Sequence, residues 1–191
     1  MNGHQAARDR LVALEQRISA IYPVLPPAFW ELRQNIRRVL EQAHMDGCLK
    51  QPSKDIRPPL YQSKEPDGYG VAVITGGRRS ETWADGGQFE RDDGARFNFS
   101  IVVSYQESKP NEPPKAPSLI AYHFNLAFPD NRVPAFVRFD LNEAKFASES
   151  RDAARSPLLC HSHPGHSDMT VPSPILAPEE VLDVILRMHL R

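Results

Sequence analysis

The chain has 191 residues, with 23 basic and 24 acidic side chains and a net charge near −1, which excludes a globally basic nucleic-acid binder but not a local basic face. No apolar run reaches the roughly 20 residues that a membrane-spanning helix needs, and the first residues lack the apolar stretch of a signal peptide. Two cysteines are too few for a disulfide framework, so we expect a reducing, cytoplasmic setting.

The first fifty residues have the periodicity of amphipathic helices. Apolar residues recur at steps of three and four over 11–21, and again after Pro27 until Gly47, a residue typical of helix C-termini. Arg33 and Arg37 lie off the apolar side of this second helix. Their ordinary interpretation is a solvated surface, and the alternative is a surface that contacts phosphate. Residues 1–50 are therefore predicted to form N-terminal helices.

After an irregular connection over 51–68, the hydrophobic period changes from 3.6 to 2, which predicts strands. The predicted strands are "YGVAVITGG", "ARFNFSIVVSY", "SLIAYHFNLAF", "PAFVRFDL" and "SPLLCHSHP". A last helix, "APEEVLDVILRMHLR", has Pro178 in its first turn. The sequence thus predicts an α+β fold, in which a helical pair (1–50) precedes an antiparallel meander of four to five strands closed by a C-terminal helix (51–191). We expect the two parts to form one compact unit.

Three of the seven histidines lie within six residues, in "HSHPGH" at 161–166. Because side chains alternate along a strand, fixing the apolar residues in the core assigns the polar ones to the opposite face. That face is predicted to carry His123, Asn125, Arg138, Asp140, His161 and His163, with His166 in the adjoining turn. The alternative is an ordinary solvent-exposed face of an antiparallel sheet. Histidine is an unusual residue for such a face, which favours a functional cluster.

The leading hypothesis is a protein that processes or binds nucleic acid, with a site like that of a metal-independent ribonuclease and no cofactor. Imidazole titrates near neutral pH, so a histidine pair can serve as general base and general acid in RNA cleavage. Guanidinium groups match phosphate oxygens, and a carboxylate can orient an imidazole. The assigned catalytic residues are His161, His163, His166 and Asp140, and the assigned substrate-binding residues are Arg138, His123, Arg33 and Arg37.

Two other functions remain open. One is a zinc-dependent hydrolase, because a His-x-His strand places two imidazoles on one side, where they could share a zinc ion with a third ligand and a water. The positions eight and eleven residues after His163 are Val171 and Pro174, whereas zinc deubiquitinase-like enzymes have Ser and Asp there, so that family is excluded. The other function is non-catalytic: a subunit or neutralising partner that recognises its target through the same polar face.

The C-terminal third resembles an uncharacterised bacterial family of domains of unknown function. The resemblance consists of Arg-Phe-Asp at 138–140, His-Pro at 163–164, Pro-x-Pro at 172–174 and the "VILRMHL" helix. The arginine–aspartate strand followed by a histidine-rich strand is also similar, more weakly, to small toxins of the TumE-like kind. These resemblances imply a toxin–antitoxin or phage-defence context. They also imply nucleic acid as the target, RNA more than DNA, and a protein partner encoded nearby.

Overall fold

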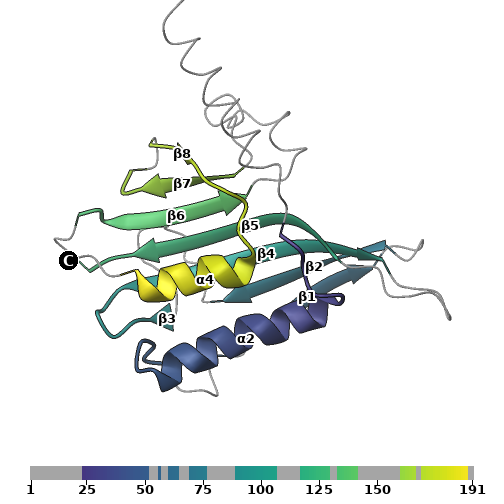
Figure 1. Cartoon of the computed structure of the whole chain (residues 1–191), viewed down its shortest axis with the longest axis horizontal. Helices are drawn as coiled ribbons and strands as arrows, with labels where there is room; N and C mark the ends of the chain where they lie inside the picture. The colour runs from purple at the N-terminus through teal and green to yellow at the C-terminus, as the bar shows by residue number, and fades with distance from the viewer. Residues whose placement is uncertain are drawn as a thin grey trace, which may run out of the picture.

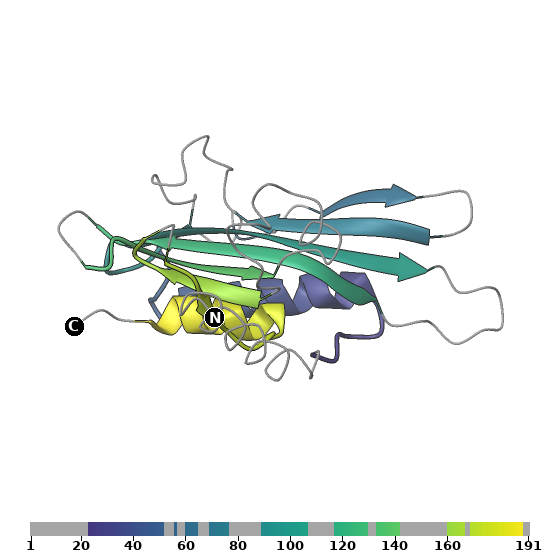
Figure 2. The ribbon, with the colours of Figure 1, turned by 90° about the horizontal axis from the view of Figure 1, so that it is seen from above.

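Two helices lie on the same side of one antiparallel sheet in this computed structural model of the chain (Figures 1 and 2). The structure describes residues 23–51, 56, 60–64, 69–76, 89–106, 117–129, 133–141, 160–166 and 169–188. The helix predicted over 11–21 lies outside these residues. Within them the α+β class is confirmed, and so is the C-terminal helix on the sheet.

The described sheet has eight strands, in the order β1-β2-β4-β5-β6-β7-β8, with β3 paired to one end of β4. Neighbouring strands run antiparallel throughout. Their bounds are β1 Leu60–Lys64, β2 Tyr69–Gly76, β3 Phe89–Glu90, β4 Arg96–Gln106, β5 Ser118–Ala127, β6 Phe136–Leu141, β7 Cys160–Pro164 and β8 Val171–Pro172. All five predicted strands are present, as β2, β4, β5, β6 and β7.

Three strands were not predicted, and the expectation of an irregular connection over 51–68 was wrong for Leu60–Lys64. That segment, "LYQSK", does not alternate apolar with polar residues, and its backbone pairs with β2 along its whole length. β3 and β8 have two residues each, too short for any period to show. These strands arise from backbone pairing at positions that side-chain patterning does not mark.

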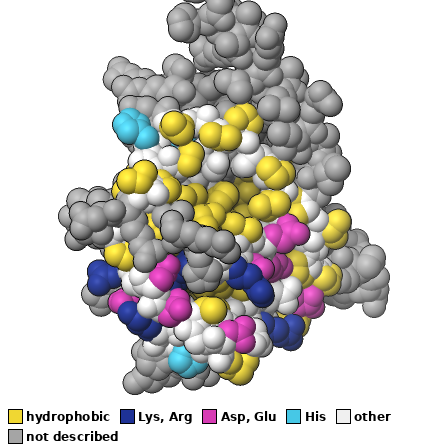
Figure 3. Space-filling view, turned by 60° about the vertical axis from the view of Figure 1, so that its left-hand side comes forward, with side chains coloured by type: hydrophobic (Ala, Val, Ile, Leu, Met, Phe, Trp, Pro, Cys, Tyr) yellow, Lys and Arg dark blue, Asp and Glu magenta, His cyan; other side chains and the backbone are white. Residues whose placement is uncertain are grey.

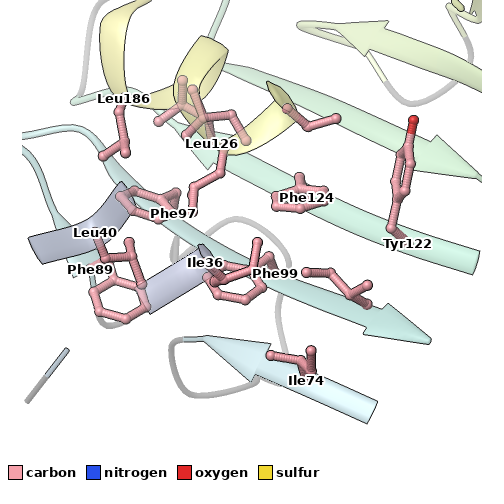
Figure 4. Packing of buried hydrophobic residues seen from close by; sticks show 14 of the residues in the cluster. Ile36, Leu40, Ile74, Phe89, Phe97, Phe99, Tyr122, Phe124, Leu126 and Leu186 are labelled. Carbon is pink, nitrogen blue, oxygen red and sulfur yellow. The ribbon is translucent and has the colours of Figure 1, made fainter. Parts of the chain in front are cut away.

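The core lies between the helices and one face of the sheet (Figure 4). Every second residue of β4 is buried there, and β5 contributes in the same way. The buried set on these two strands is Phe97, Phe99, Ile101, Val103, Tyr122, Phe124 and Leu126. Burying one such side chain contributes about 2 kcal/mol. Gly76 on β2 permits this packing, because a Cβ there would lie 2.1 Å from Cε1 of Phe99.

Helix α2 (Phe29–Met45) follows the predicted apolar period, since Leu32, Ile36 and Leu40 are completely buried. It ends before Gly47, whose φ of 76° is the left-handed geometry that glycine tolerates best. Helix α4 (Pro178–Arg187) begins at the predicted proline. The carboxylate of Glu180 accepts a hydrogen bond from the Ala177 backbone N–H at 2.7 Å.

One irregularity in β5 corrects the predicted core. The register between β4 and β5 shifts between Val102 and Val103, so that Val102 pairs with Ala121 but Val103 pairs with Leu119. Strict alternation along "SLIAYHFNLAF" back from Tyr122 would place Ile120 on the core face, yet Leu119 packs against the core instead. The shift lies before Tyr122, so the alternation of β5 is regular from Tyr122 to Leu126.

Candidate functional site

The register of β5, β6 and β7 places polar side chains in two rows on the face opposite the helices. His123 pairs with Asp140, which pairs with His161; one step along, Asn125 pairs with Arg138, which pairs with His163. Paired residues in an antiparallel ladder share a face, and residues two apart on a strand do as well. The predicted convergence of all six side chains on one face is therefore confirmed. We refer to His123, Arg138, Asp140, His161 and His163 as the polar cluster.

The carboxylate of Asp140 is the centre of the polar cluster. One oxygen, Oδ1, accepts a short hydrogen bond from Nδ1 of His123. The other, Oδ2, accepts from Nε of Arg138 at 2.7 Å. The guanidinium of Arg138 also donates from a terminal nitrogen to Nε2 of His163, at 2.8 Å. One carboxylate and one guanidinium thus connect three strands.

The electrostatics of the cluster favour an ionised carboxylate. Burial raises the pKa of Asp140, but the hydrogen bond from His123, the interaction with His163 and the positive charge of Arg138 together outweigh it. The net result is a pKa well below the usual range of an aspartate. Asp140 is therefore ionised, although its side chain is only 8% exposed.

The two imidazoles of β7 approach Asp140 at longer distances than His123 and Arg138 do. Nε2 of His161 lies 3.6 Å and Nε2 of His163 lies 3.4 Å from Oδ2 of Asp140. Both distances exceed the 2.7–3.2 Å range of an N–H···O bond. The two rings stand at 78° to each other with centroids 4.8 Å apart. The ring nitrogens of His161 and His163 and the carboxylate of Asp140 could together hold a metal ion.

The polar cluster contains partly exposed side chains and buried ones. The side chains of His123 and Arg138 are each 24% exposed. His161 and His163 are buried, with 3% and 4% of their side chains accessible. A large substrate at this face would therefore meet Arg138 and the exposed part of the His123 ring, whose Nε2 is itself buried, whereas the other three side chains lie beneath.

Local backbone geometry ends β7 at Pro164, one residue after His163. Gly165 has a φ of 81°, and its N–H donates to the carbonyl of Phe136 at 2.7 Å. A Cβ at this glycine would lie 2.6 Å from Cβ of Pro134, so only glycine fits without movement. The turn carries His166 away from the ladder into an exposed position. His166 was predicted to act beside His161 and His163, but it does not share their buried environment.

Arg33 and Arg37, the other predicted phosphate contacts, lie on α2. That helix packs on the core face, so the sheet separates both residues from the polar cluster. Arg37 pairs instead with Glu41, one turn along the helix, at 2.7 Å. The ordinary interpretation of a solvated helix surface is confirmed for Arg37. On the face shown in Figure 3, Lys and Arg side chains are interspersed with Asp and Glu, which does not make a basic surface.

Two polar residues of β4 extend the rows and were missed. Ser100 pairs with His123 and Asn98 pairs with Asn125, which makes the polar face four strands wide. The alternation of "ARFNFSIVVSY" already contained this signal, because its apolar residues occupy the other face. The thiol of Cys160 lies on the core face, 3.4 Å from the Tyr122 hydroxyl.

Comparison of the chain with protein-family models, with curated proteins and with solved structures found no match. None of the helices in the described residues is long and apolar enough to cross a membrane.

Proposed function

We propose that the chain cleaves RNA by transesterification at the polar cluster, as part of a bacterial defence or toxin–antitoxin system. The observation that carries the proposal is the shared carboxylate of Asp140, which holds an imidazole on one oxygen and a guanidinium on the other. A base and a phosphate-binding cation are thus fixed on either side of one buried anion.

His123 is the base in this proposal. Its Nδ1 is engaged by Asp140, so Nε2 is the nitrogen left to exchange a proton; this atom is buried, so a bound substrate must first uncover it. A buried carboxylate that accepts from Nδ1 fixes the ring orientation and stabilises the protonated imidazole that forms during catalysis. This assignment differs from the sequence hypothesis, which gave acid–base roles to His161, His163 and His166. The side chains of His161 and His163 are only 3% and 4% exposed, so they are supporting residues here.

Arg138 is the phosphate contact. Its Nε and one terminal nitrogen are held by Asp140 and His163, which fixes the plane of the guanidinium. A guanidinium presents five N–H donors, so further donors are available to the oxygens of a phosphodiester. The partial exposure of this side chain gives a polymer access to it.

The proposed reaction begins when Nε2 of His123 takes the proton of a ribose 2′-hydroxyl. The 2′-oxygen then forms a bond to phosphorus as the bond from phosphorus to the 5′-oxygen breaks. Water protonates the leaving 5′-oxygen, and Arg138 stabilises the charge that builds up on the phosphoryl oxygens. The products are a 2′,3′-cyclic phosphate and a 5′-hydroxyl, so an intact 2′-hydroxyl is required and DNA is not a substrate.

The test is cleavage of a labelled RNA by the full chain in the presence of EDTA, compared with the same strand carrying 2′-deoxyribose throughout. We expect only the RNA to be cut, with cyclic phosphate ends. His123→Gln should lower the rate by about 10²-fold or more, the usual contribution of a general base. Arg138→Gln should lower it by about 10²-fold.

Matched controls come from the helix side of the sheet. His44→Gln removes an imidazole that contacts the backbone carbonyl of Leu49. Arg187→Gln removes a guanidinium paired with Asp183 on the surface of α4. Both variants should cut at the wild-type rate. Wild-type rates for folded His123→Gln, or equal cutting of the deoxy strand, would reject the proposal.

A further inference from the structure

A second property of the polar cluster follows from the spacing of three ligand atoms. Oδ2 of Asp140 and Nε2 of His161 and of His163 point toward one another from neighbouring strands. Ligands at 2.0–2.2 Å from a tetrahedral zinc ion lie about 3.3–3.5 Å apart. The observed 3.4 and 3.6 Å between the carboxylate oxygen and the two nitrogens are close to that spacing, and all three ligand atoms lie within 4.8 Å of one another.

We propose that Asp140, His161 and His163 form a site for one transition-metal ion of the zinc class, and that this ion competes with Arg138. The proposal concerns metal binding alone and does not depend on RNA cleavage. Two imidazoles and one carboxylate form a ligand set typical of zinc with an open fourth position. Magnesium and calcium prefer oxygen ligands and fit this set poorly.

The site is preorganised by its surroundings. His161 and His163 are two residues apart on β7, and Asp140 pairs with His161 across the ladder, so the backbone fixes all three. The hydrogen bond from His123 occupies Oδ1 of Asp140 and leaves Oδ2 directed at the two imidazoles. Partners of this kind, which orient a metal-binding carboxylate, commonly change metal affinity by about 10–100-fold.

Arg138 already holds a positive charge against two of the three ligand atoms. Its guanidinium donates to Oδ2 of Asp140 and to Nε2 of His163. The ring nitrogen has one lone pair, so it cannot accept from Arg138 and bind a metal at the same time. Metal binding therefore requires the guanidinium to leave His163, and removing Arg138 should strengthen the site. If Arg138 only supported the cluster, its removal would weaken metal binding.

The test is a titration of the EDTA-treated, dialysed full chain with Zn²⁺, followed by competition with a chromophoric chelator. We expect one equivalent bound by the wild type. Affinity should fall at least about 100-fold in His161→Gln and in His163→Gln and stay unchanged in His44→Gln. Arg138→Gln should bind about 10-fold more tightly. Weaker binding by Arg138→Gln, or unchanged binding by both β7 variants, overturns the proposal.

A measurement on the wild type alone keeps the test independent of how the variants fold. Co²⁺ should bind with the visible absorption of a four-coordinate ion, and Zn²⁺ should shift the Nε2 resonances of two buried histidines. A six-coordinate cobalt spectrum, or unshifted histidine resonances at one equivalent of zinc, overturns the proposal. Failure of RNA cleavage would leave these results unaffected, so the two proposals fail separately.

Discussion

Arg138 on β6 lies directly across the ladder from His163 on β7, and its guanidinium donates to Nε2 of that imidazole over 2.8 Å. A guanidinium has no acceptor, so Nε2 must be the accepting nitrogen. The ring proton of His163 therefore lies on Nδ1 in the metal-free protein.

This proton position can be measured. A long-range ¹H–¹⁵N spectrum of the metal-free chain should show His163 protonated at Nδ1. In Arg138→Gln the constraint is lost, and the proportion of the Nε2-protonated form should rise. A wild-type spectrum with the His163 proton on Nε2 contradicts the assigned hydrogen bond.

Asp140→Asn is expected to destabilise the fold by about 2 kcal/mol, because a buried carboxylate that accepts charge-assisted hydrogen bonds loses its charge. The comparison is Asp183→Asn, which removes the carboxylate of an exposed helix pair with Arg187. Such pairs contribute under about 0.5 kcal/mol. Urea unfolding in EDTA gives both values. Equal losses would show that Asp140 has no special role in stability.

Substitution of the completely buried Arg91 should lower the free energy of unfolding more than substitution of an exposed arginine. The guanidinium of Arg91 donates to the backbone carbonyl of Ile185 in α4 at 2.5 Å and to Asp93 at 3.0 Å. Arg91→Ala leaves a cavity and removes a partner from the last turn of α4, so we expect a loss of about 3 kcal/mol. Arg187→Ala, at an exposed pair, serves as the reference. Similar unfolding midpoints for the two variants would contradict this prediction.

Tyr122 should make the protein sensitive to alkali. Burial and the neighbouring Cys160 raise the pKa of its hydroxyl far above the ordinary value. The unfolded chain loses this proton near pH 10 while the folded chain retains it, so the free energy of unfolding falls as pH rises above about 10. Between pH 9 and pH 11 this tyrosine accounts for about 1.4 kcal/mol, and Tyr122→Phe should reduce the decline by that amount. Parallel pH curves for the two proteins would refute the assignment.

The sequence predicted most of what positions the site, because large apolar residues alternate strictly on β4, β5 and β6. Phe97, Phe99 and Phe124 fix which face of each strand is buried, and the opposite face follows from geometry. That β5, β6 and β7 are neighbours could also be anticipated, since consecutive strands in a meander tend to lie side by side. The register that pairs His161 with Asp140 comes from the structure alone.

Exposure within the site could not be predicted in the same way. Alternation assigns a face, and it does not distinguish a side chain that is 3% accessible from one that is 24% accessible. The position of Arg33 and Arg37 also depended on which face of the sheet α2 covers. That choice is made by Leu32 and Ile36 packing on the phenylalanine side, a tertiary contact with no local signature.

The strand that carries His161 and His163 is held unequally on its two sides. β6 pairs with all five residues of β7, whereas β8 pairs with two. β8 is the last strand of the sheet, and its brief detachment from β7 needs far less free energy than separating β4 from β5. Detachment of β8 would let solvent and small ions reach the buried imidazoles of His161 and His163, while the rest of the fold stays assembled.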